Sequence, residues 1–324
     1  MEQRRLGSSG LRVSRLGLGT MTWGRDTDEH EAREQLEAFM EAGGTLVDTA
    51  ASYGDGRSER VLGDLLETAV PRSEVVVATK SGISLSTGEL VVDVSRRALL
   101  DQLDGSLIRL GADHVDLWQV EAWSPDVPLG EVLSAVDAAV TSGRARYAGV
   151  CNFGGWQTGW VAAHQAGFPG RVPISSTQVE YSLVQRGIER EVLPAARAVG
   201  LGLLAWSPLG RGVLTGKYRT GLPADSRAAS PHFSEFVETY LDGRSRKIVE
   251  ATCTAADGLG VQPLEVALTW VRDRPGVTAA ILGARTAAQL RGGLRSDDLT
   301  LPAEIVDALD DVSAPPFGYP ERPE

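Results

Sequence analysis

The sequence predicts an α/β fold, a (β/α)8 TIM barrel that begins with a β-hairpin and carries a long loop after its seventh strand. Short apolar runs recur eight times, and segments with helical periodicity separate them. Strands that are apolar throughout and alternate with helices are typical of a parallel sheet covered by helices. Eight such units indicate closure into a barrel, and 324 residues are a usual length for one such domain. We therefore expect a single barrel domain over residues 1–324.

The predicted strands follow an N-terminal hairpin. Residues 3–15 form two short strands around a turn at Ser8–Gly10. We expect the eight barrel strands at residues 15–20, 45–50, 74–80, 115–120, 146–152, 176–182, 202–208 and 278–284.

The predicted helices lie between these strands, and several end in glycine, as helix C-termini often do. The clearest of them cover residues 28–43, 95–111, 128–143 and 186–200. Residues 217–246 are too long for an ordinary connection, which favours a functional loop. A terminal helix near 302–311 precedes a proline-rich tail, residues 313–324, that is either disordered or lies over the barrel mouth.

Composition argues against several classes of protein. The sequence has no run of about 18 apolar residues and no apolar stretch of the signal-peptide kind, so we expect a cytoplasmic protein that does not enter a membrane. Two cysteines and four histidines show no ligand spacing, which argues against a metal site. A net charge of −11 argues against nucleic-acid binding. The surface helices show no distinctive apolar seam, so a monomer is the default expectation.

Polar side chains follow three successive strands, at the ends where a parallel barrel places its chemistry. Asp48 lies near the end of the second strand and Tyr53 just beyond it, Lys80 ends the third strand, and Glu121 follows the fourth. One polar residue at a strand end is ordinary, but the joint placement favours a catalytic site.

Tyr53 is the candidate acid-base group. A free tyrosine ionises near pH 10, so at neutral pH it needs a neighbour that lowers its pKa. The ammonium of Lys80, held by Asp48, would stabilise the phenolate. This set suits the reduction of a carbonyl, in which hydride arrives at carbon and a proton at oxygen.

An anion site is predicted near the last two strands, where barrels most often hold phosphate. The segment "GLGTMTWG" has the wrong glycine spacing for a Rossmann fingerprint. Residues 211–227, after strand seven, carry four cations against one acid, and Arg285 follows strand eight. The small residues of "SPLGRG" let backbone amides approach an anion.

Seven motifs stand in order along the chain: "LGLGTMTWG", "DTAASYG", "ATK", "GVCNF", "QVEYS", "WSPLGRGVLTGKY" and "ILGARTAAQL". Together they resemble the aldo-keto reductases over essentially the whole chain. "LTGKY", "DSRA" and "LGARTAAQL" resemble the branch of bacterial reductases and the beta subunits of voltage-gated potassium channels. The resemblance implies NADPH or NADP+ bound without a Rossmann fold, direct hydride transfer, and Tyr53 as the proton donor supported by Lys80 and Asp48.

The resemblance also implies the cofactor contacts. Asn152 and Gln178 would hold the nicotinamide carboxamide, and Trp206 would stack on the ring. Arginines suit the 2′-phosphate that distinguishes NADPH from NADH. The implied cofactor-binding residues are Thr20, Asn152, Gln178, Trp206, Ser207, Leu209, Gly210, Lys217, Arg227, Arg285 and Gln289.

The chain departs from the family pattern at three places. Cys151 stands where the family usually has serine, and Gly292–Gly293 where it usually has Glu-Asn. Glu121 stands in place of the catalytic histidine.

An ionised Glu121 would raise the pKa of Tyr53 and impair carbonyl reduction, whereas a protonated Glu121 would donate a hydrogen bond. Family members that reduce steroid carbon-carbon double bonds carry a glutamate here, which makes a conjugated enone one expected substrate. Two alternatives stay open. Position 121 is a mutated or engineered one, or the Glu121 side chain points away from the pocket and Trp123 lines it instead.

Three functions compete. The first is an NADPH-dependent reductase of aldehydes, ketones or conjugated enones, with Trp23, Tyr53, Trp118 and Trp123 lining the substrate pocket. The second is an NADP(H)-binding sensor or auxiliary subunit with little turnover, and the third is a barrel that acts on a phosphorylated sugar. The presence of Tyr53 with its supports favours the first, because binding alone needs no proton donor.

Overall fold

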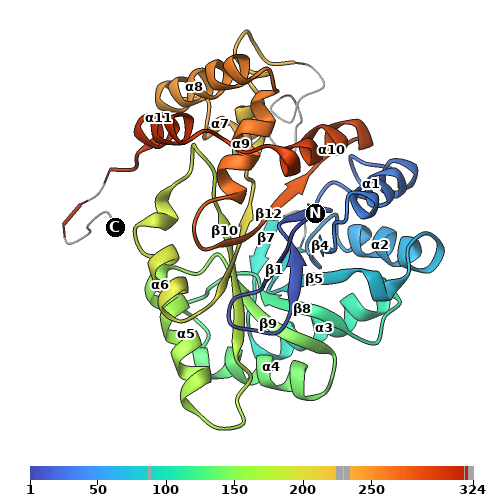
Figure 1. Cartoon of the computed structure of the whole chain (residues 1–324). Helices are drawn as coiled ribbons and strands as arrows, with labels where there is room; N and C mark the ends of the chain where they lie inside the picture. The colour runs from blue at the N-terminus through green and yellow to red at the C-terminus, as the bar shows by residue number, and fades with distance from the viewer. Residues whose placement is uncertain (87–88, 224–228, 230–233, 317, 320–324) are drawn as a thin grey trace.

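Eight parallel strands close into a barrel in the computed structural model, which describes residues 1–86, 89–223, 229, 234–316 and 318–319 (Figure 1). Around the barrel the strands are β3 (Leu16–Gly19), β4 (Leu46–Asp48), β5 (Val76–Ser81), β8 (Val115–Val120), β9 (Ala145–Cys151), β10 (Ile174–Glu180), β11 (Gly202–Trp206) and β12 (Val277–Gly283). Pairing of β12 with β3 closes the ring. The predicted barrel is confirmed.

Helices surround the barrel (Figure 1). They are α1 (Glu29–Glu41), α2 (Arg57–Thr68), α3 (Arg96–Leu110), α4 (Leu129–Thr141), α5 (Gly155–Gly167), α6 (Val192–Ala198), α7 (Ser234–Glu238), α8 (Gly243–Leu259), α9 (Pro263–Arg272), α10 (Ala287–Leu294) and α11 (Ala303–Ser313). The helix predicted over 186–200 is interrupted, with a 3-10 turn η2 (Gly187–Glu189) before α6. Pro194 has no amide hydrogen to donate, so it is tolerated in the first turn of α6 but would interrupt a helix that began at residue 186.

The N-terminal hairpin closes one end of the barrel. Its strands β1 (Gln3–Arg5) and β2 (Arg12–Ser14) pair antiparallel, as predicted. Leu6 and Val13 are fully buried and pack against Leu46 and Leu204 inside the barrel. The candidate site lies at the opposite end of the barrel, where the strands terminate.

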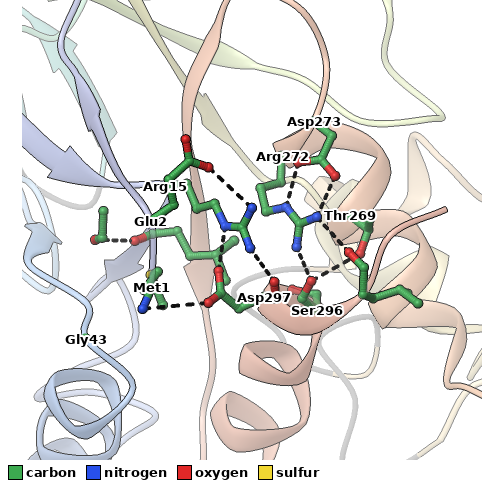
Figure 2. Close-up of polar contacts among 12 residues, drawn as sticks. Met1, Glu2, Arg15, Gly43, Thr269, Arg272, Asp273, Ser296 and Asp297 are labelled. Atoms are coloured by element: carbon green, nitrogen blue, oxygen red, sulfur yellow. Dashed lines mark hydrogen bonds and ion pairs between the residues drawn. The ribbon is translucent and has the colours of Figure 1, made fainter.

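A polar network ties the start of β3 to the last third of the chain (Figure 2). Arg15 Nε donates to Asp297 Oδ1 at 2.6 Å and also pairs with Glu2. Asp297 belongs to the 3-10 turn η5 (Arg295–Asp298), whose Ser296 carbonyl accepts from Arg272 of α9. These bonds reinforce the junction at which the barrel closes.

Two segments depart from the regular alternation. A hairpin of β6 (Ile83–Ser86) and β7 (Glu89–Val92) follows β5 and was not predicted. After β11 the chain forms the 3-10 turn η3 (Gly210–Thr215) and then α7, with residues 224–228 and 230–233 outside the described part. Beyond α11, residues 314–316 and 318–319 of the predicted tail are described. No helix in the described ranges is long and apolar enough to cross a membrane.

Candidate active site

Lys80 and Asp48 form a buried ion pair at the C-terminal end of the strands. Their side chains are 1% and 2% exposed, and Lys80 Nζ lies 2.6 Å from Asp48 Oδ2. Gln178 of β10 donates to the other carboxylate oxygen at 2.8 Å. Both oxygens of Asp48 therefore accept a hydrogen bond, which offsets the cost of burying the charge.

The three hydrogens of the Lys80 ammonium each have an acceptor. Besides Asp48, they reach the Thr49 carbonyl at 2.9 Å and the Tyr53 hydroxyl oxygen at 3.2 Å. Tyr53 thus accepts from Lys80, and its own hydrogen is left to donate. Within the described part of the chain, no acceptor lies within hydrogen-bond distance of that hydrogen, and Tyr53 lines the central cavity.

Tyr53 is held as a neutral phenol. Burial raises the pKa of Tyr53 far above its ordinary value, while Lys80 lowers it only in part and Asp48 and Glu121 raise it further. Lys80 acts on this pKa in the expected direction, but burial outweighs the ammonium, so the net effect in the protein alone is a raised pKa instead of the lowered one that we expected. Burial by itself would lower the pKa of Lys80, but Asp48 raises it above the ordinary value, so the ammonium stays charged.

Glu121 follows β8, and its side chain lines the same cavity as Tyr53 and Lys80. It therefore does not point away from the site. Ser52 Oγ donates to its carboxylate, 3.1 Å from one oxygen and 3.3 Å from the other. Burial raises the pKa of Glu121 to about 7, although Lys80 and the Ser52 bond lower it. The carboxyl therefore changes charge near neutral pH. Ser52 carries no signal in the sequence that marks it as this partner.

Buried hydroxyls fix the loop that carries Tyr53. Ser58 Oγ donates to the Thr20 carbonyl at 2.8 Å and lies 3.2 Å from Thr49 Oγ1. Thr20 is fully buried, and its Oγ1 donates to the Asp48 carbonyl. Thr20 is not among the residues that line the cavity, so the structure gives it a supporting position in place of the predicted cofactor contact.

A cavity of about 480 Å³ opens from this cluster toward β11, β12 and α10. It contains most of the residues predicted for a cofactor: Asn152, Gln178, Trp206, Ser207, Leu209, Lys217, Arg285 and Gln289. Gly210 is buried beside the cavity without lining it. Arg227 lies outside the described residues.

Asn152 connects three parts of the cavity wall. Its backbone φ is 59°, an uncommon value for a residue other than glycine. Its Nδ2 donates to the Glu121 carbonyl at 3.1 Å, and its Oδ1 accepts from Trp206 Nε1 at 3.0 Å. These bonds orient the amide and the indole that the family resemblance associates with the nicotinamide.

The turn after β11 has a backbone suited to an anion. Ser207, Gly210, Arg211 and Gly212 all have positive φ values, between 50° and 98°. Such turns can direct successive amide groups into a concave site for phosphate. Lys217 and Arg285 add two cations to the same cavity wall. The described residues thus fit a phosphate-bearing cofactor.

Arg211 has a different role from the anion contact that its place in the basic stretch suggests. It forms a two-pronged ion pair with Glu180 of β10, at 2.6 and 2.9 Å. It also donates to the Phe236 carbonyl at 2.7 Å, and its guanidinium lies 3.8 Å from the centre of the Phe236 ring. Arg211 therefore ties α7 to the barrel, and Glu180 neutralises its charge.

The three tryptophans predicted for the substrate pocket lie outside the cavity lining. Trp23 and Trp118 are fully buried in the core, where their indoles donate to Gln35 and Ser81. That prediction is wrong for both, because their rings pack where strands meet helices. Trp123 is partly buried and makes edge-to-face contacts with the buried ring of Phe153 and the exposed ring of Trp156.

Comparisons with known proteins identify the family. The family model described as "Aldo/keto reductase family" matches residues 15–314, which include all the site residues above. An uncharacterized oxidoreductase, YrpG, of Bacillus subtilis (strain 168) is 36% identical over 335 residues, covering 100% of this chain and 99% of that protein. A probable voltage-gated potassium channel subunit beta of Oryza sativa subsp. japonica is 34% identical, with the same shares covered. The aldo-keto reductase YhdN of Bacillus subtilis (strain 168) is 29% identical, covering 100% of this chain and 97% of that protein.

Proposed function

Since the chain belongs to the aldo/keto reductase family, we propose that it is an NADPH-dependent reductase of carbonyl compounds with Tyr53 as the proton donor. One observation carries the proposal. All three hydrogens of Lys80 are used, one of them on the Tyr53 oxygen, so the phenol hydrogen is left to donate toward the cavity. A protein that only binds a nucleotide has no need for a buried lysine arranged in this way.

Tyr53, Lys80 and Asp48 each have a separate role in proton transfer. Bound NADPH would supply the hydride. Tyr53 would give its proton to the substrate oxygen, and Lys80, 3.2 Å away, would stabilise the phenolate that remains. Asp48 keeps Lys80 charged and fixed, so that the ammonium is in place before the reaction begins.

The preference for NADPH over NADH rests on the basic residues of the cavity. Lys217 and Arg285 line it. We assign Arg285, with Arg227, to the 2′-phosphate, because guanidinium groups match phosphate oxygens in pairs. An Arg285→Gln variant should lose affinity for NADPH by roughly tenfold while its affinity for NADH is unchanged. Fluorescence titration with both cofactors measures this, and equal losses for the two would contradict the assignment.

Glu121 determines which carbonyl compounds are reduced. In its protonated form Glu121 offers a second hydrogen-bond donor beside Tyr53. Two donors suit the carbonyl oxygen of a conjugated enone, whose β-carbon takes the hydride. In its charged form it opposes the negative charge that develops on that oxygen. We therefore propose conjugated enones as substrates in addition to simple aldehydes and ketones.

The test follows NADPH oxidation with matched pairs of a saturated ketone and its conjugated enone. Tyr53→Phe should reduce turnover by at least a hundredfold, roughly the size of general-acid catalysis, while NADPH affinity stays within a factor of about three. Glu121→His should shift preference from enone to ketone. Undiminished turnover in Tyr53→Phe would refute the role of Tyr53.

A second function is favoured by one comparison, the likeness to a protein named as a probable potassium channel subunit beta. On this alternative the chain is an NADP(H)-binding auxiliary subunit with little turnover. Wild-type protein that binds NADPH but oxidises none across the ketone and enone panel would favour it. Activity that depends on Tyr53 would favour the enzyme.

A further inference from the structure

The outer face of α5 exposes an unusual set of aromatic side chains. Trp156, Trp160 and Phe168 are 63%, 47% and 55% exposed, and they follow one another at intervals of four and eight residues. His164 completes the series, with its ring between those of Trp160 and Phe168. Residues four apart lie on one side of a helix, which aligns Trp156, Trp160 and His164. Phe168 follows the last residue of α5, and its ring lies 5.1 Å from that of His164, so the four rings form a continuous ridge, hereafter the aromatic ridge. Ordinary surfaces expose large apolar side chains singly.

The same stretch lacks charge altogether. Residues 152–170 contain no Asp, Glu, Lys or Arg, although 23% of the chain is charged. A helix face in contact with water normally carries charged side chains. Depletion of charge together with enrichment in tryptophan is the composition of an interface core. The monomer expected from the sequence depended on the absence of an apolar seam, and α5 carries one.

A row of small residues runs beside the aromatic ridge. Gly159, Ala163 and Gly167 are also spaced by four, and none is buried. A Cβ atom added at Gly159 or Gly167 would meet nothing within 4 Å, so nothing covers this row, hereafter the small-residue groove. One helix thus presents both a ridge and a groove of matching period.

We propose that α5 is the contact surface between two copies of this chain, with the aromatic ridge of each copy lying in the small-residue groove of the other. Ridge-into-groove packing of rows spaced by four is the commonest way in which helices pack. A ridge and a groove side by side on one helix complement themselves under two-fold rotation, as a symmetric dimer requires.

Charge favours a second copy over a charged surface as the partner. The α5 face is neutral, so a neutral face fits it better than a charged one, and the α5 residues of two copies can meet without bringing their own charges together, although each copy has a net charge of −11. An anionic membrane or nucleic acid would instead select a basic surface.

The contact area sets the expected strength. At about 150–250 Å² for a whole aromatic side chain, the exposed fractions of the three large rings give about 300 Å² per copy. A standard stable interface buries about 800 Å² per partner. The dimer is therefore reversible, and its extent depends on protein concentration. Figure 1 shows α5 on the outside of the barrel between α4 and α6, the helices that would add the remaining contacts.

Sedimentation velocity over a series of concentrations tests the proposal. We expect wild type to shift from monomer to dimer as concentration rises, and Trp160→Glu to stay monomeric over the same range. Ile108→Glu, at an exposed apolar residue of α3, is the matched control and should dimerise like wild type. A wild type that remains monomeric to several hundred micromolar, or a Trp160→Glu variant that dimerises normally, would overturn it.

Disulfide trapping locates the contact without relying on a disruptive variant. The two native cysteines, Cys151 and Cys253, are buried. The groove of one copy faces the ridge of the other, so a mixture of Ala163→Cys and His164→Cys copies should form a covalent dimer under mild oxidation. Glu67→Cys on the exposed face of α2 should form far less. Equal yields from the mixture and from Glu67→Cys would place the contact elsewhere and refute the proposal.

Discussion

Replacing Glu121 by glutamine should stabilise the protein, and more so at pH 8 than at pH 5. Burial raises the pKa of Glu121 to about 7 from an ordinary value of 4.5. The folded protein therefore binds this proton more tightly than the unfolded chain does. The stability that this bound proton contributes is fully present below pH 4.5 and is lost as the pH rises through about 7.

The size of the effect follows from the two pKa values. Each pKa unit corresponds to about 1.36 kcal/mol, so the charged carboxylate costs the folded state about 3 kcal/mol at pH 8. At pH 5 the cost is only about 1 kcal/mol. Glutamine has the same shape as glutamate and can still accept the Ser52 hydrogen bond. The substitution therefore removes only the charge.

Urea unfolding of wild type and Glu121→Gln between pH 5 and pH 8 provides the measurement. The difference between the two proteins should grow by about 2 kcal/mol over this range. Glu67→Gln, at an exposed position on α2, is the control and should show no such growth. A difference that is constant with pH, or that shrinks as pH rises, would refute the burial argument.

Three further predictions concern other contacts. Lys80→Met leaves Asp48 buried without its partner and should lower the free energy of unfolding by about 3–5 kcal/mol at pH 7; a loss below about 1 kcal/mol would contradict the buried ion pair. Arg211→Ala leaves Glu180 unpaired and releases α7, so hydrogen exchange of the amides in α7 should accelerate while that of β10 does not. Asp297→Ala removes charge-assisted bonds at the barrel closure and should cost about 1.5–3 kcal/mol in thermal unfolding, without changing NADPH affinity.

The strands and their chemistry were predictable because both depend on local patterns. Each barrel strand is a short apolar run, and a parallel barrel places every strand end on the same face. This is why the sequence alone could place Asp48, Lys80 and Glu121 together, although 32 and 41 positions separate them. The β6–β7 hairpin escaped prediction because its strands do not contribute an apolar run to the barrel.

The predictions that failed depend on packing across the fold. Trp23 and Trp118 are large aromatic residues near the site, but the sequence does not tell which side of a strand or loop each ring occupies. All the cations of the stretch after β11 were expected to be available to bind an anion. Arg211 is instead neutralised by Glu180, 31 positions earlier. The pKa of Tyr53 went in the opposite direction to that expected, because the depth of burial is a property of the folded structure.

Charge balance links Glu121 to catalysis. Asp48 and Lys80 cancel, and Tyr53 is a neutral phenol, so the cluster is neutral while Glu121 is protonated and carries one negative charge once it ionises. The Glu121 carboxylate then opposes the negative charge that develops on a substrate oxygen beside Tyr53, which raises the barrier to reduction. On the proposed function, kcat for reduction should fall as pH rises through about 7 in wild type, and Glu121→Gln should remove that fall. A wild-type kcat that rises over this range would mean that the carboxylate form is the active one, with Glu121 acting as a proton acceptor.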